Sequence, residues 1–85
     1  MVASLTVEDL EEIYLMRSRL ESLAARFAAE RLTPEDAKAL AAVVEELEVQ
    51  TSAAETGAIR QLNIRLHQLI WQASHTTRLT QVLMN

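Results

Sequence analysis

The chain has 85 residues with one glycine, one proline and a formal net charge of −4; 49% of its residues are hydrophobic and 24% are charged. This length allows one small domain at most. The amino-acid composition, which is rich in Ala and Leu, favours packed helices over a sheet. No cysteine is present, which excludes disulfides and thiol chemistry, and the eight dispersed basic residues form no patch that could follow nucleic-acid phosphates.

No apolar run approaches the ~20 residues that span a bilayer. The N-terminus carries acidic residues instead of the basic and then hydrophobic order of a secretory signal. We therefore expect a soluble, cytoplasmic protein that has no contact with a membrane and does not bind nucleic acid directly through these residues.

Two threonines mark the starts of the first two helices. Thr6 and Thr33 each follow an apolar residue and precede acidic residues that fall in the first helical turn, as N-cap residues do. Pro34 occupies the first helical position of the second segment, where its missing N–H costs no hydrogen bond. These patterns predict helices over residues 7–31 and 34–50.

Arg17 lies within the apolar stripe of the first predicted helix, where a solvated arginine is unexpected. Two interpretations remain open. Arg17 either pairs with Glu21 one turn on or extends to the edge of the core, or its planar guanidinium awaits an anion inside a helical pocket. The stripe consists of Leu10, Ile13, Ala24 and Ala28.

The second predicted helix has one apolar face and one acidic face. The acidic face, which carries Glu45, Glu46 and Glu48, is interpreted as solvated rather than as a metal site. Residues 51–57 are small and polar and include the only glycine, so they predict the connection to a third helix over residues 58–74. A fourth helix is predicted to begin near Thr77.

The third predicted helix has apolar residues on two sides, which predicts a central helix. Asn63 and His67 are four residues apart in the seam between these sides and can converge on a metal or polar ligand. Alternatively, His67 is a structural histidine that makes a hydrogen bond within the fold. His75 is not an evident partner of His67 in a ligand site. Because no nucleophile, carboxylate pair or glycine-rich phosphate loop accompanies His67, we predict no enzyme activity.

Three segments together resemble a known family. Residues 13–31 resemble the first helix of the C-terminal effector-binding domain, the FCD domain, of FadR-type regulators in the GntR superfamily. Residues 33–36 are similar to the start of that domain's second helix. Residues 62–74 resemble the family segment written as Asp, two variable residues, Phe and His. The resemblance extends from residue 5 to residue 84.

This resemblance implies an all-α, antiparallel bundle of about four helices, a partial version of the FadR C-terminal domain. It implies a homodimeric sensor in which a small carboxylate effector changes DNA affinity through an attached winged-helix domain. At the level of single residues, the resemblance implies that Arg17 contacts an anion and that Asn63 and His67 bind the ligand. It also implies that His67 is a ligand for a divalent metal such as zinc.

Two residues and the end of the chain depart from the family pattern. Asn63 replaces the ligand aspartate, Leu66 replaces the phenylalanine, and the sequence ends before the helices that carry the other histidines. We therefore expect an incomplete metal site.

We also expect residues 1–85 to be one domain that is a fragment, a split gene product or a degenerate relative. The alternative function is a structural helical module that oligomerises and senses no ligand.

Overall fold

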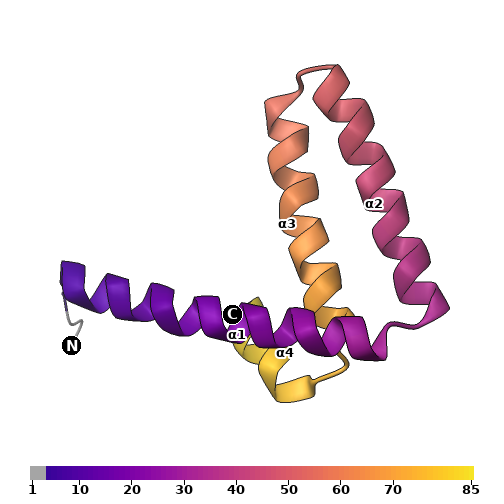
Figure 1. Cartoon of the computed structure of the whole chain (residues 1–85). Coiled ribbons are helices and arrows are strands. Elements are labelled where there is room, and N and C mark those ends of the chain that lie inside the picture. The colour runs from indigo at the N-terminus through magenta and orange to yellow at the C-terminus, as the bar shows by residue number, and fades with distance from the viewer. Residues whose placement is uncertain (1–3) are drawn as a thin grey trace.

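The computed structural model describes residues 4–85, which form four α-helices. These are α1 (Val7–Arg31), α2 (Pro34–Ser52), α3 (Thr56–Ala73) and α4 (Thr77–Met84). Figure 1 shows α2 and α3 as a hairpin that stands across the C-terminal half of α1, with α4 folded back against α1. The predicted all-α fold of about four helices is confirmed. Residues 1–3 of the predicted domain lie outside the described residues.

Both predicted threonine caps are present as capping boxes. The hydroxyl oxygen of Thr6 accepts a hydrogen bond from the backbone N–H of Asp9, and the Asp9 carboxylate accepts one from the N–H of Thr6, at 3.0 and 2.9 Å. Thr33 and Asp36 repeat the arrangement at the start of α2. Each box satisfies two backbone donors that have no partner within the helix, which fixes where α1 and α2 begin.

The connection between α2 and α3 is shorter than the predicted residues 51–57. Helix α2 continues to Ser52 and α3 begins at Thr56. Ala54, with φ of 57°, supplies the left-handed residue that reverses the chain, whereas Gly57 lies in the first turn of α3 without a positive φ. The turn therefore lies within the predicted segment, but Ala54 and not Gly57 adopts the left-handed conformation that glycine usually supplies. Helix α3 ends at Ala73, one residue before the predicted end.

The core lies where α1, α3 and α4 meet. It contains Ala24 of α1, Trp71 of α3 and Leu83 of α4, and the partly buried Leu20, Ile70 and Leu79 pack against it. Ala24 is completely buried, and its small side chain allows α1 to approach the indole of Trp71 closely. Helix α3 contacts each of the other three helices, as its two apolar sides predict.

The described chain is open rather than compact. Its accessible surface is 6650 Å² and its radius of gyration is 15.4 Å, whereas compact proteins of this size have about 5,000 Å² and about 12 Å. Helix α2 has no buried residue, and the N-terminal half of α1 extends away from the other helices (Figure 1). Among residues 4–85, no helix is long and apolar enough to cross a membrane.

Candidate functional site

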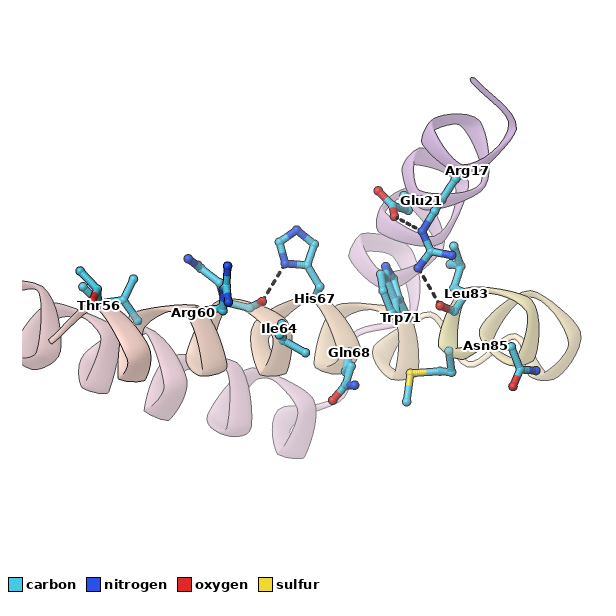
Figure 2. Close-up of a pocket in the computed structure, with 13 residues that line it drawn as sticks. Arg17, Glu21, Thr56, Arg60, Ile64, His67, Gln68, Trp71, Leu83 and Asn85 are labelled. Atoms are coloured by element: carbon cyan, nitrogen blue, oxygen red, sulfur yellow. Dashed lines mark hydrogen bonds and ion pairs between the residues drawn. The ribbon is translucent and has the colours of Figure 1, made fainter. Parts of the chain in front are cut away.

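A groove of about 770 Å³ follows α3 from its first turn to the C-terminal end of α4. Its polar side chains are Arg17, Glu21, Thr56, Arg60, Asn63, His67, Gln68 and Asn85. Its apolar side chains are Ile59, Ile64, Trp71, Leu83 and Met84. Figure 2 shows that Arg17 and Glu21 enter from α1 beside Trp71, whereas Arg60 and His67 rise from α3 itself. The predicted site residues Arg17, Asn63 and His67 therefore line one groove.

Arg17 makes three contacts at the end of the groove near α4. Its Nε forms an ion pair with Oε1 of Glu21 at 3.0 Å, its Nη2 donates to the backbone carbonyl of Leu83 at 2.8 Å, and its Cζ lies 5.4 Å from the centre of the Trp71 ring. The pairing with Glu21 that the sequence offered as one interpretation is present. Because a guanidinium has five N–H donors and these bonds use two, three remain for a ligand.

The bond from Arg17 to Leu83 also has a structural consequence. Leu83 lies in the last turn of α4, where backbone carbonyls lack partners within the helix and carry partial negative charge. The guanidinium therefore joins α1 to the end of α4 over the face of Trp71, which adds a cation–π attraction. Sequence reasoning missed this partner because Arg17 and Leu83 are 66 positions apart.

His67 has one ring nitrogen occupied and one available. Its Nδ1 lies 2.8 Å from the backbone carbonyl of Asn63. Since a carbonyl only accepts hydrogen bonds, Nδ1 carries the proton in the neutral ring and Nε2 carries the lone pair. The ring also meets Trp71 edge to face, at 6.2 Å between centres. His67 is thus oriented by its own helix, with Nε2 free to meet a ligand.

The donors around His67 do not fit a divalent metal by themselves. Across residues 4–85, no group of three or more His, Cys, Asp or Glu side chains is arranged to hold a metal ion. Asn63, which lines the groove beside His67, offers a neutral amide oxygen, whereas divalent cations prefer the charged oxygen of a carboxylate. We therefore assign no chemistry of this groove to a metal.

A second polar cluster, which sequence reasoning missed, lies at the turn between α3 and α4. Nε2 of His75 contacts Oδ2 of Asp36 at 2.7 Å, and Arg31 donates to the backbone carbonyls of Ser74 and His75. The backbone N–H of Thr33 and the contact with His75 lower the pKa of Asp36 below its ordinary 3.8. This cluster joins the turn to α1 and α2, away from the groove.

Two comparisons with known proteins agree with this architecture. The family model described as the FCD domain matches residues 12–85. The protein described as an uncharacterized HTH-type transcriptional regulator, YdhC, of Bacillus subtilis (strain 168) is 33% identical over 84 residues, which cover 96% of this chain and 37% of that protein. The chain thus spans little more than a third of the length of this relative. No solved structure matches the chain. From the match over residues 12–85 and the similarity to this relative, we conclude that the chain belongs to the FCD family, the effector-binding domains of GntR-type transcriptional regulators.

Proposed function

We propose that the groove binds a small carboxylate effector and that the chain is the sensing and dimerisation domain of a transcriptional regulator. The FCD family consists of regulatory domains rather than enzymes. The observation that carries the proposal is that Arg17 from α1 and Asn63 and His67 from α3 line one groove of about 770 Å³. This volume lies within the range of small-molecule sites, about 300–1,000 Å³.

The groove residues offer the groups that a carboxylic acid requires. Arg17 retains three N–H donors, and Asn63 supplies an exposed amide. The Nε2 atom of His67 can accept from a hydroxyl of the effector. Ile64 and Met84, whose side chains are exposed, provide apolar surface beside these polar groups. Such a site, apolar with a few convergent polar groups, is typical of ligand pockets.

The exposed surface supports a homodimer. The chain exposes about a third more area than a compact protein of its size, and this excess is larger than the ~800 Å² that a standard interface buries on each partner. A second copy that packs on the N-terminal half of α1 and the free face of α4 would cover apolar side chains in a symmetric contact. These side chains are Leu10, Ile13, Leu15, Met16, Val82 and Met84.

The relative's name, an HTH-type transcriptional regulator, supports the further proposal that DNA is bound by a separate winged-helix domain of the full-length protein. In that arrangement, the effector changes the DNA affinity by shifting the relative position of two DNA-binding domains through the dimer. Residues 4–85 contribute sensing and association only.

One observation favours the second candidate function, a structural helical module that senses no ligand. The guanidinium of Arg17 already pairs with Glu21, bonds to Leu83 and lies over Trp71. A residue with these contacts has a sufficient structural role without any effector. The two functions therefore differ in whether the groove responds to carboxylates.

A thermal unfolding screen with small carboxylates separates the two functions. A ligand that binds only the folded chain raises its Tm in proportion to the logarithm of ligand concentration. The sensor function predicts that at least one of acetate, lactate, succinate, hexanoate and benzoate raises Tm, and that Asn63→Leu and Arg17→Ala reduce this rise. Arg19→Ala, an exposed change outside the groove, is the control. No rise with any acid contradicts the sensor function and favours the structural module.

A further inference from the structure

The charges along the groove do not balance. Arg17 is paired with Glu21 at 3.0 Å, so these two side chains contribute no net charge to the lining. Arg60 is the other guanidinium of the groove, and it takes part in none of the ion pairs found within residues 4–85. The uncompensated positive charge of the groove therefore belongs to Arg60.

Arg60 shares its face of α3 with the predicted ligand residues. Asn63 follows it by three residues and His67 by seven, and both spacings return to the same helical face. Figure 2 shows Arg60 and His67 on the same side of α3. All three side chains are exposed, so a ligand can reach them. A carboxylate between Arg60 and Asn63 would receive hydrogen bonds from a charged and a neutral donor.

Apolar residues follow along the groove towards α4. Ile64 lies one turn after Arg60, and Trp71, Leu83 and Met84 lie at the other end. The distance along α3 from Arg60 to Trp71 is about 16 Å, from a rise of about 1.5 Å per residue. Within the described residues, the groove thus has an unpaired cation at Arg60, and its other end has apolar side chains beside the ion pair of Arg17 and Glu21.

We propose that Arg60 is the anion-binding residue of the groove and that its ligand is a monocarboxylate with an apolar body. The carboxylate binds at Arg60 and Asn63, and the body extends over Ile64 towards Trp71. One uncompensated charge matches one carboxylate. This inference rests on the proposed function, and it leaves to Arg17 the part of joining α1 to the end of α4 beside the apolar body of the ligand.

The single tryptophan of the chain makes the proposal measurable, because Trp71 lies in the groove. Its fluorescence is titrated with hexanoate and with hexanamide, which has the same chain length and no charge. The variants are Arg60→Gln and, as matched control, Arg65→Gln, an exposed arginine of α3 outside the groove. We expect the wild-type chain to bind hexanoate about tenfold more tightly than hexanamide, as a charge-assisted hydrogen bond at a solvated site allows.

The proposal predicts that Arg60→Gln removes this preference, leaves the affinity for hexanamide unchanged and preserves the circular dichroism spectrum. Arg65→Gln keeps the preference. A preference that persists in Arg60→Gln, or is lost equally in Arg65→Gln, overturns the assignment of Arg60. A wild-type chain that binds neither probe overturns the proposed ligand class. In any of these cases, a Tm increase with another carboxylate in the thermal screen leaves the proposed function standing.

Discussion

The guanidinium of Arg17 in α1 donates a 2.8 Å hydrogen bond to the backbone carbonyl of Leu83 in the last turn of α4. The same group lies over the face of Trp71 in α3, with Cζ 5.4 Å from the ring centre. One side chain thus contacts the three helices that form the core. Any ligand or mutation that withdraws Arg17 therefore loosens the attachment of α4.

Replacing Arg17 by alanine is expected to destabilise the fold by about 1–2 kcal/mol. The variant loses a charge-assisted hydrogen bond and a cation–π contact, and because the Arg17 side chain is 40% exposed, water screens part of both interactions. Urea unfolding followed by circular dichroism measures the change, with Arg19→Ala as control. Equal stabilities of the two variants would show that the bond to Leu83 contributes nothing.

The double variant Arg17→Leu with Glu21→Leu tests whether the ion pair itself is needed for folding. If the pair is only structural, two leucines beside Trp71 are tolerated or stabilising, because apolar residues commonly replace partly buried ion pairs without loss. The measurement is again the free energy of unfolding in urea. Loss of the helical fold in this variant would contradict the expected tolerance and show that the contacts of Arg17 and Glu21 are required for folding.

Ala24 is expected to tolerate no larger side chain. It is completely buried against Trp71 and Leu83, so Ala24→Leu forces α1 away from α3 and costs about 1–3 kcal/mol. Ala25→Leu, one position on and exposed, changes helix propensity equally and serves as control. A shift of the urea midpoint that is the same for both variants would contradict the close packing described here.

The stability of the chain is expected to fall in acid partly because of Asp36. Its pKa in the folded chain is lowered below 3.8, so its contribution is fully present above the ordinary pKa and is lost as pH falls through the lowered value. Asp36→Asn should therefore flatten the decline in stability below about pH 4. Urea unfolding between pH 6 and pH 2.5 measures this, and identical slopes for both proteins would refute it.

The dimer is expected to depend on the apolar surface of α1. Ile13→Glu places a charge among Leu10, Tyr14 and Met16, all of which are exposed in the single chain, and should convert a dimer into a monomer with unchanged helix content. Sedimentation equilibrium measures the mass, with Ala25→Glu as control. A wild-type chain that sediments as a monomer at the highest soluble concentration would contradict the proposed homodimer.

The sequence predicted the features that depend on neighbouring residues. The starts of α1 and α2 follow from Thr6 and Thr33 with their acidic partners, because a capping box involves residues three positions apart. The placement of Asn63 and His67 on one face followed from helical spacing in the same way. The all-α fold was predictable from these local signals and from composition.

Contacts between distant segments could not be predicted in this way. The bond between Arg17 and Leu83 and the pair of His75 with Asp36 depend on how α1, α2 and α4 are placed in space. The turn lies within the predicted residues 51–57, but Ala54 could not be predicted as its left-handed residue because alanine gives no local signal for that conformation. The role proposed for Arg60 depends on the pairing of Arg17 with Glu21, which the sequence left as one of two interpretations.

The most direct test of the sensor function is native mass spectrometry of the purified chain, because it reports the subunit count and any bound small acid together. We predict a dimer that retains a carboxylate, which Arg17→Ala and Arg60→Gln lose while Arg65→Gln retains it. An oligomer or monomer that carries no ligand, also after incubation with the carboxylates of the thermal screen, would contradict the sensor function and leave a structural module.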